Sequence, residues 1–460
     1  MSAVESPIRY PDTSSPKVMT QRAWVLVVLN FILPGSAQAL AGNRQLGRFG
    51  LRATLTLWVI AILSLISFNL WQAFTITLFT ASWMLWVIAI IAVFYAVLWV
   101  VLTVDTLRLV KLVKTGPKSR WILSLFAVAT MVVVSGTAVY ASQLAMSTNA
   151  LIGSVFDAGP AVPPVDGRYN FLLIGGDAGA DRDGLRPDSA MVVSVDADTG
   201  RTVTIGMPRD LHNITFPEGS VMAGLYPDGY TEDTADYCAE WACLNTVYVD
   251  AEVNHADAFA EQEAAGTPAG IAAMMEAASG ITGLQIQYYA LIDMQGFADL
   301  IDALGGVDVC VEQRIPIVAD EDSDPAEWIE EGCQHLNGYY ALWYARARYQ
   351  IGDGDYGRMQ RQATLEQAIV DQFTPAVILA KFQDIAASTT QIVKTNVPQS
   401  MLGYFVTLAE KARAIPITRV ELIPANGIDP QDPDYALIAA LIQEALTPPT
   451  PTGTSTPTAG

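Results

Sequence analysis

Residues 185–210, LRPDSAMVVSVDADTGRTVTIGMPRD, hold two β-rich runs separated by a short turn signal. The runs are Ser189–Asp196 and Arg201–Pro208, and the Asp198-Thr199-Gly200 segment between them is typical of a hairpin turn. Upstream, Tyr169–Gly176 (YNFLLIGG) is a short apolar run ending in two glycines, the pattern of a buried strand. We therefore expect three neighbouring strands here.

Helical and strand patterns alternate farther along the chain. The predicted elements are helices at Pro268–Ser279, Met294–Leu304, Gly338–Tyr349 and Arg358–Phe373, and strands at Gln285–Asp293 and Val307–Gln313. Strands interleaved with helices indicate a layered fold of the α/β class.

Charge and hydrophobicity are distributed unevenly along the 460 residues, of which 51% are hydrophobic and which carry a net charge of −21. The first 145 residues have eleven basic and three acidic side chains, a net charge of +8, and the remainder has a net charge of −29. The apolar excess lies in the basic part, which rules out a wholly soluble enzyme. A nucleic-acid partner is unlikely, because phosphates would repel the acidic part.

The basic part contains candidate membrane helices. Between Arg52 and Asp105 there are 52 uncharged residues, which as a helix would extend about 78 Å, enough for two crossings of a ~30 Å hydrocarbon core. A mildly polar stretch at 69–82 predicts the turn between them. Trp121–Ser142 predicts a third crossing.

The orientation follows from the basic loop between Arg108 and Arg120, which should be cytoplasmic, so that residues after 142 lie outside the cell. Residues 23–43 are apolar but interrupted by Pro34-Gly35-Ser36. A full crossing there would place a basic N-terminus outside, against the positive-inside rule. We favour a re-entrant or interfacial hairpin, with a fourth crossing as the alternative.

These observations predict a multi-pass protein of the plasma membrane with an extracellular domain. The expected parts are a cytoplasmic N-terminus (1–22), a membrane region with three to four helical segments (23–145), a linker (146–164), a catalytic domain (165–430), a C-terminal helix (431–446) and a disordered Pro/Thr-rich tail (447–460).

All four cysteines follow the last predicted crossing, and an even number in an exported domain indicates two disulfides. Three pairings are possible. We favour the sequence-adjacent pairs, Cys238 with Cys243 and Cys310 with Cys333, over a zinc site, because no nearby histidine completes a standard ligand set.

Arginines are concentrated in a few places of the acidic part. Besides Arg186 and Arg209, two groups lie in YARARYQIGDGDYGRMQRQ (344–362). On an extended segment Arg346 and Arg348 would share a face. On a helix, the spacing i, i+3 and i+4 would place Arg358, Arg361 and Gln362 on one face. Guanidinium groups bind phosphate oxygens bidentately, so convergence would form a phosphate or pyrophosphate site. Taken singly, each arginine could instead form a structural ion pair.

Two aspartates are expected at the same edge of the sheet. Asp177 ends the Gly-Gly strand, and Asp188 lies just before the next strand. A pair of carboxylates suits Mg²⁺, which prefers oxygen ligands and shares them with phosphates. The alternative is that Asp188 caps a turn and Asp177 is a strand-end loop residue.

Taken in order, these segments resemble the LytR-CpsA-Psr family of cell-wall phosphotransferases over residues 168–425. Further matching segments are NFLLIGGD (170–177), LNTVY (244–248), GLQIQYYALIDMQGFADLIDALGGVDV (283–309) and GCQHLNGYYALWYARAR (332–348). The resemblance implies an exported α-β-α sandwich that transfers a glycopolymer from a polyprenyl-pyrophosphate carrier to a sugar hydroxyl of peptidoglycan. Teichoic acid, capsule and arabinogalactan polymers are all compatible.

The resemblance also implies residue roles. Asp177 and Asp188 would be associated with Mg²⁺. The pyrophosphate would be bound by Arg186, Arg209, Arg346, Arg348, Arg358 and Gln362, with Arg361 beside them. The expected catalytic group is Arg186, Asp188, Arg209 and Asp210, with Asn245 in support. The polyprenyl pocket would be lined by Ile271–Ile281, Tyr288–Leu304 and Ala363–Leu379.

Two rival functions stay open. A polyprenyl-pyrophosphate phosphatase would use water in place of the sugar, and an envelope regulator would have no enzymatic activity. A serine hydrolase is disfavoured, because no G-x-S-x-G motif occurs and His212, His255 and His335 lie in no recognisable triad.

Overall fold

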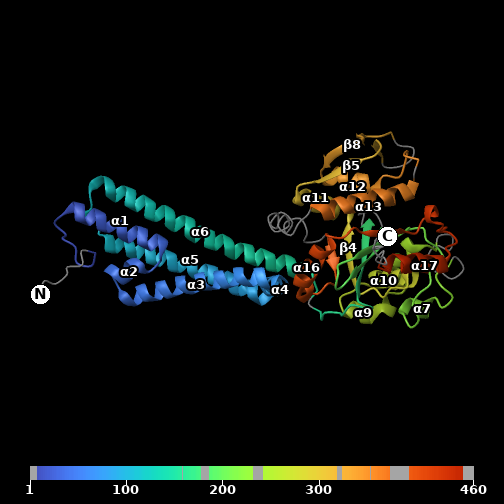
Figure 1. Cartoon of the computed structure of the whole chain (residues 1–460), viewed down its shortest axis with the longest axis horizontal. Coiled ribbons are helices and arrows are strands. Elements are labelled where there is room, and N and C mark those ends of the chain that lie inside the picture. The colour runs from blue at the N-terminus through green and yellow to red at the C-terminus, as the bar shows by residue number, and fades with distance from the viewer. Residues whose placement is uncertain are drawn as a thin grey trace, which may run out of the picture. The chain divides into compact units, whose positions relative to one another are not determined.

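The computed structural model describes residues 8–157, 159–177, 186–231, 242–318, 324–352, 354–372 and 393–448. The chain divides into two units, Met1–Ala150 and Leu151–Gly460 (Figure 1). The first unit is helical and the second is built on a β-sheet.

The helical unit contains three segments that are long and apolar enough to cross a membrane: Arg44–Leu70 (α3), Ser82–Lys114 (α5, Ser82–Val110, with the 3-10 turn η1, Leu112–Lys114) and Pro117–Val155 (α6). These coincide with the three predicted crossings. The predicted turn at 69–82 is instead occupied by a short helix, α4 (Gln72–Thr80).

The first apolar segment is interrupted between α1 (Pro16–Ile32) and α2 (Ser36–Ala41). Gly35 has a φ of +97°, and a Cβ there would collide with the backbone of α3, so only glycine fits the turn. The Gln38 amide anchors α2 by donating to Leu102 O (2.8 Å) and Thr106 Oγ1 (3.0 Å) of α5. The interruption between the two helices coincides with the turn of the predicted hairpin. That this hairpin enters the membrane stays a prediction.

The second unit is organised around a six-stranded mixed sheet with the order β10-β3-β2-β1-β4-β9. Its strands are β1 (Arg168–Asp177), β2 (Arg186–Asp196), β3 (Thr202–Met207), β4 (Tyr288–Asp293), β9 (Val393–Thr395) and β10 (Thr418–Glu421). The pairs β1–β2, β2–β3 and β4–β9 are antiparallel, and the pairs β1–β4 and β3–β10 are parallel. The three strands predicted first are therefore adjacent in the centre of the sheet.

One face of the sheet forms the main core. Leu172, Val192 and Ile205, from β1, β2 and β3, are fully buried and belong to one cluster with apolar residues of three helices. These helices are α8 (Leu244–Asn254), α10 (Ala269–Thr282) and α17 (Tyr435–Leu446). Since side chains alternate along a strand, the odd-numbered neighbours in β1 and β2 point to the opposite face.

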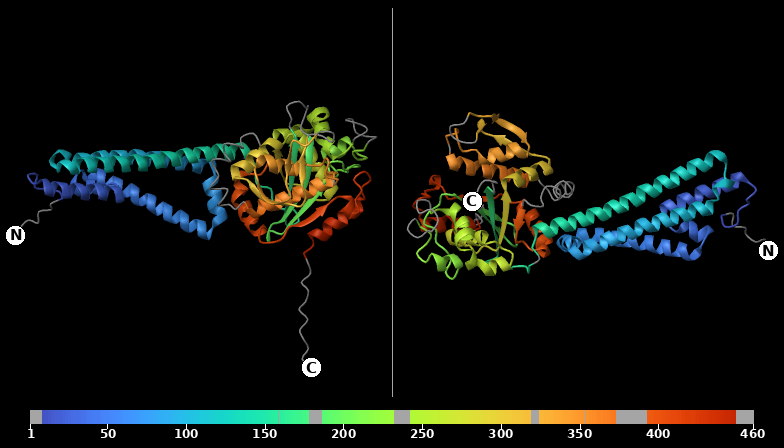
Figure 2. Two further views of the ribbon diagram at one scale, coloured as in Figure 1. Left: turned by 90° about the horizontal axis from the view of Figure 1, so that it is seen from above. Right: turned by 180° about the vertical axis from the view of Figure 1, so that it is seen from behind.

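The opposite face is covered by α11 (Met294–Leu304), α13 (Gly354–Gln372) and α16 (Leu402–Ala412). Near the start of β1, Phe405 of α16 packs against Tyr169, Phe171 and Tyr288 with ring centroids 5.1–5.5 Å apart. Figure 2 shows the sheet between its two helical layers. The unit is thus an α-β-α sandwich, which confirms the predicted fold class.

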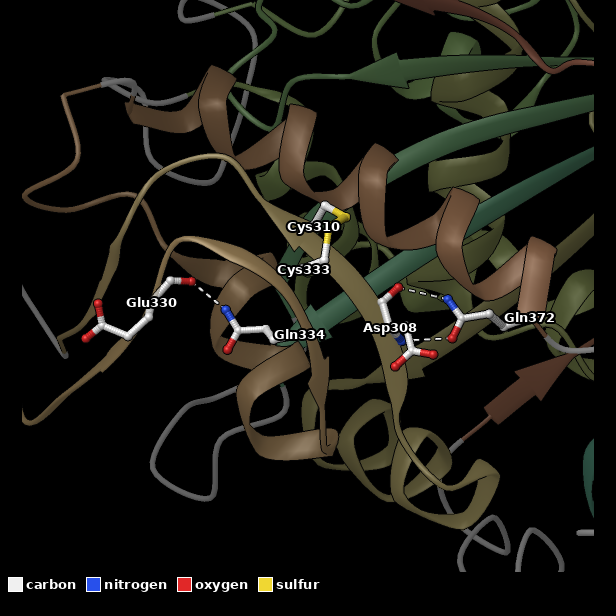
Figure 3. Close-up of a disulfide and its surroundings, with 6 residues drawn as sticks. All are labelled: Asp308, Cys310, Glu330, Cys333, Gln334 and Gln372. Carbon is white, nitrogen blue, oxygen red and sulfur yellow. Dashed lines mark hydrogen bonds between the residues drawn. A yellow bond between two sulfur atoms is a disulfide. The ribbon is translucent and has the colours of Figure 1, made fainter.

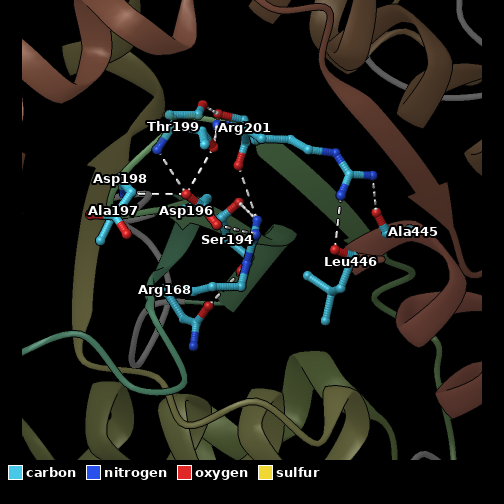
Figure 4. Close-up of polar contacts among 12 residues, drawn as sticks. Arg168, Ser194, Asp196, Ala197, Asp198, Thr199, Arg201, Ala445 and Leu446 are labelled. Carbon is cyan, nitrogen blue, oxygen red and sulfur yellow. Dashed lines mark hydrogen bonds and ion pairs between the residues drawn. The ribbon is translucent and has the colours of Figure 1, made fainter. Parts of the chain in front are cut away.

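Two arginines are used to hold the β2–β3 hairpin in place (Figure 4). Asp196 Oδ1 accepts hydrogen bonds from the backbone N–H groups of Asp198 (3.2 Å) and Thr199 (2.8 Å). Arg168 donates to Ser194 Oγ and O at 2.7 and 2.9 Å. Arg201 donates to the last carbonyls of α17, those of Ala445 and Leu446. For these two arginines the structural role is therefore the correct one.

A smaller sheet pairs β5 (Val307–Val311) with β8 (Gly332–Leu336) and packs with α12 (Gly338–Arg346) in its own apolar cluster. The predicted disulfide between Cys310 and Cys333 links directly opposed residues of these strands (Figure 3). Gln372, at the end of α13, bonds both backbone groups of Asp308 at 2.8 Å.

The second predicted disulfide is not formed in this structure. Cys243 is a free, buried thiol at the N-cap of α8, and its Sγ donates to Asn245 Oδ1 at 3.0 Å. The thiol is thus engaged within its own helix turn. Cys238 lies outside the described residues.

We predict that changing both Cys310 and Cys333 to alanine lowers the stability of the second unit by about 3 kcal/mol, because the bond closes a loop with a sequence separation of 23 in the unfolded chain. Thermal unfolding of the detergent-solubilised protein measures the effect. A thiol reductant should lower the Tm of the wild type to that of the double variant and leave the variant unchanged. Equal Tm values without reductant would contradict the prediction.

Candidate functional site

The ends of the central strands bring the predicted site residues to one edge of the sheet. Asp177, the last residue of β1, pairs with Arg186, the first residue of β2, beyond a bulge at Gly175/Gly176. β3 runs antiparallel to β2, so Arg209 and Asp210 follow it at the same edge. The strand ends thus place four of the predicted residues close together along the backbone.

Asp188 is the meeting point of two arginines. Its Oδ1 accepts from Arg209 Nη1 at 3.0 Å, and both side chains keep partial exposure, 38% and 24%. Its backbone carbonyl accepts from Arg358 Nη2 of α13 at 3.3 Å. Arg358 is 6% exposed, so its charge is held in a largely water-excluded position. The structure therefore joins Asp188, Arg209 and Arg358 into one cluster.

Arg361 and Gln362 face the end of α12. Arg361 donates to Ala347 O, and Gln362 Nε2 donates to Ala345 O at 3.2 Å. These bonds satisfy terminal carbonyls of the helix, which ends at Arg346 and not at Tyr349 as predicted. Both side chains are thus engaged with the segment that carries Arg346 and Arg348.

Arg346 and Arg348 lie against aromatic rings. The Arg346 guanidinium carbon is 5.3 Å from the Trp343 ring centroid, and that of Arg348 is 4.5 Å from the Tyr349 ring centroid. Stacking of this kind orients a guanidinium while leaving its N–H edge for other partners. Both side chains are only partly buried.

The loop after β3 is held by α8. Asn245 N donates to Arg209 O and Leu244 N donates to Leu211 O, both at 3.0 Å. Asn245 therefore positions Arg209 through the backbone. Asp210 Oδ1 is buried and has no hydrogen-bond partner among the described residues. Burial, together with the Asp210 charge, raises the pKa of the nearby Cys243 thiol to about 11, so this thiol stays protonated at neutral pH.

The residues at this edge offer hard oxygen donors of the type that Mg²⁺ prefers. Asp177 and Asp188 stand on adjacent strands, two positions apart in the pairing. Among the described residues no group of three or more His, Cys, Asp or Glu side chains is suited to a metal ion.

Three charged residues near this edge were missed by sequence reasoning. Glu421 of β10 pairs with Gly206 of β3, and the Arg419 guanidinium donates to Ala363 O and Gln367 Oε1 of α13. Burial raises the pKa of Glu421 to about 7 against the opposing effect of Arg419. Burial likewise raises the pKa of Glu366 to about 7, with Arg419 opposing and Glu421 adding to the rise. The contacts span more than 50 residues of sequence, so no local pattern could reveal them.

Two cavities flank the second unit. The larger, about 760 Å³, lies between residues 215–220 and α10, and Ala272, Met275 and Ser279 of the predicted lipid-pocket segment Ile271–Ile281 line it. The smaller, about 560 Å³, lies between α13 and the β10 edge of the sheet. In the segment 271–281, Ile271, Met274 and Ile281 are buried in the main core, and its role as a lipid pocket stays a prediction.

The chain belongs to the LytR_cpsA_psr family, whose model matches residues 142–435. It is 31% identical over 191 residues to the polyisoprenyl-teichoic acid–peptidoglycan teichoic acid transferase TagV of Bacillus subtilis, covering 39% of this chain and 49% of that protein. It is 25% identical over 308 residues to the cell wall biosynthesis protein LcpA of Corynebacterium glutamicum, covering 61% and 56%. The chain thus spans about half the length of these curated relatives.

Solved structures give weaker matches. The crystal structure of Bacillus subtilis TagV has a TM-score of 0.42 at 23% identity and covers 61% of this chain and 98% of that one. TagT bound to LI-WTA has a TM-score of 0.40 at 18% identity and covers 62% and 92%.

We predict that Glu421→Gln stabilises the protein in alkaline but not in acidic solution. The folded-state pKa of about 7 lies above the ordinary 4.5, so ionisation of Glu421 opposes folding increasingly as pH rises between these values. After discounting for partial exposure, the gain should be roughly 1 kcal/mol near pH 8 and close to zero near pH 4.

Thermal unfolding at both pH values measures this effect. Glu263→Gln, at an exposed position of α9 (Ala260–Ala264), is the charge-matched control and should change neither Tm. A Glu421→Gln variant that is less stable than the wild type at the higher pH would contradict the prediction.

Proposed function

We propose that the protein is a membrane-anchored phosphotransferase that moves a glycopolymer from a polyprenyl-pyrophosphate carrier to a sugar hydroxyl of peptidoglycan. The observation that carries the proposal is the cluster of Arg209, Arg358 and Asp188 at one edge of a strongly acidic domain. Arginine charges held together in partly desolvated positions favour an anion between them. Family membership and the transferase names of the relatives support the same chemistry.

The carrier lipid is proposed to lie on the α13–α16 face of the sheet. There Leu173, Met191, Val193 and Ile292 are only partly buried, whereas Leu172, Val192 and Leu291, which alternate with them, are buried in the main core. A half-covered apolar face is the environment that a polyprenyl chain requires. These partly buried residues lie between the aromatic cluster around Phe405 and the sheet edge at which Asp177 and Arg186 pair.

In the proposed reaction the pyrophosphate is bound by Arg209, Arg358, Arg346, Arg348 and Arg186. The acceptor hydroxyl attacks the phosphorus nearer the glycopolymer, a P–O bond forms to the acceptor, and the P–O bond to polyprenyl phosphate breaks. The hydroxyl proton passes to a carboxylate at the edge, for which Asp188 and Asp210 are candidates. The arginines stabilise the negative charge that develops on the phosphate oxygens.

Asp177 and Asp188 would hold Mg²⁺ in this proposal, with Asp188 Oδ1 shared with Arg209. When bound, the ion would add further neutralisation of phosphate charge.

We expect Arg209→Ala to reduce transfer on the order of 100-fold or more, because it removes a phosphate contact and the partner of Asp188. Arg209→Lys should recover only part of the activity, since a lysine lacks the planar fork. The assay follows polymer on peptidoglycan, polyprenyl phosphate and inorganic phosphate, starting from lipid-linked polymer. Release of inorganic phosphate without transfer would instead identify a phosphatase.

The matched control is Arg314→Ala. Arg314 is half exposed and pairs with Glu330 and Trp328 on the small-sheet side of the unit. Its loss should leave transfer unchanged. Full activity of Arg209→Ala would refute the proposed site.

The proposed orientation places the second unit outside the cell. Five basic residues between Arg108 and Arg120 favour a cytoplasmic loop between α5 and α6. In intact spheroplasts, added protease should remove a C-terminal epitope and spare an N-terminal one, and both should be lost after permeabilisation. Loss of the N-terminal epitope in intact spheroplasts would favour a full crossing by residues 23–43.

A further inference from the structure

The smaller cavity lies against α13, the helix that carries Arg358. It is lined by two sets of residues, one from α13 and one from β10 and the segment after it: Tyr356, Gly357, Met359, Gln360, Ala363 and Thr364, then Arg419, Glu421, Ile423 and Ala425. Within α13, Arg358 is flanked in sequence by cavity residues. One helix therefore separates the phosphate-binding residues from a second lined space of about 560 Å³.

The charged residues of the cavity wall are one base and one acid, Arg419 and Glu421. The carboxylate of Glu421 lies above Gly206, where the Cβ of any other residue would collide with Glu421 Oε2 and crowd Met359. Gly206 thus leaves room for the carboxylate at the cavity wall. Glu366, a residue of α13 outside the cavity lining, interacts electrostatically with both Glu421 and Arg419. A single guanidinium balanced by one carboxyl suits a neutral ligand better than a phosphate.

The remaining lining is a mixture of polar and apolar groups. Gln360 and Thr364 are exposed on α13 and offer an amide and a hydroxyl, while Met359 and Ile423 offer apolar surface. Such a wall can hydrogen-bond the hydroxyl and amide groups of a sugar and contact its C–H face. The volume falls within the roughly 300–1,000 Å³ of small-molecule sites.

We propose that the cavity between α13 and β10 binds a neutral N-acetylated sugar residue of the acceptor glycan, with Glu421 and Arg419 as its hydrogen-bonding residues. The inference rests on the proposed transferase function, because the cavity would bind the acceptor of that reaction. A position one helix away from the arginines lets the glycan strand reach the phosphate with a neighbouring hydroxyl. Glu421 and Arg419 are positioning residues in this arrangement.

Chitotetraose, a neutral oligomer of N-acetylglucosamine, is a suitable acceptor probe for the full-length protein in detergent. Binding is measured by NMR titration, in parallel with binding of farnesyl pyrophosphate as the donor probe. Thr364→Trp should fill the cavity from an exposed helix position, and Glu421→Gln should remove one acceptor group. Each should weaken chitotetraose binding on the order of tenfold and leave farnesyl pyrophosphate binding unchanged.

The controls separate this inference from the proposed function. Glu263→Gln should leave both affinities unchanged, and Arg209→Ala should weaken only farnesyl pyrophosphate binding. If chitotetraose binds equally to the wild type and Thr364→Trp, or binds to neither while farnesyl pyrophosphate binds, the cavity assignment is overturned and the donor site stands. If chitotetraose binding is cavity-dependent but farnesyl pyrophosphate does not bind, the cavity assignment holds and the proposed donor chemistry fails.

Discussion

Asp188 holds the candidate site together. Its carboxylate pairs with Arg209 from the end of β3, and its carbonyl accepts a bond from Arg358 of α13. Since Asp188 belongs to β2, a single residue connects two central strands with the helix on the open side of the sheet. The arginines would repel one another without this acid and, in the proposed function, without the pyrophosphate between them.

The two faces of the sheet differ in how completely their side chains are buried. The face towards α8, α10 and α17 is closed by fully buried aliphatic residues, and this core stabilises the second unit. The other face is closed at one end by aromatic rings and left partly covered in the middle. Because the core on one face is closely packed, the apolar side chains on the other face can stay partly exposed without loss of that core.

Charge is divided within the site as well as along the chain. Arg358 and Arg361 of α13 bond the backbone carbonyls of Asp188 and Ala347, whereas Glu421 and Arg419 line the cavity between α13 and β10. In the proposed arrangement, α13 separates the phosphate site from the acceptor cavity. This separation is consistent with a transfer reaction that joins an anionic donor to a neutral acceptor.

Local patterns in the sequence determined much of the architecture: the apolar helices, the hairpin around Asp198, the helix Met294–Leu304, and the short Cys310–Cys333 bond all depend on neighbouring residues. The clustering of arginines was also visible, because residues 344–362 are contiguous. Only the tertiary structure decided that Arg209 meets the carboxylate of Asp188 and Arg358 its carbonyl. It also decided that Arg168, Arg201 and Arg361 bind backbone carbonyls elsewhere. It alone brought Glu421 opposite Gly206 and engaged Cys243 with Asn245. The reason is physical: partner choice and burial depend on contacts between distant segments, which no local periodicity records.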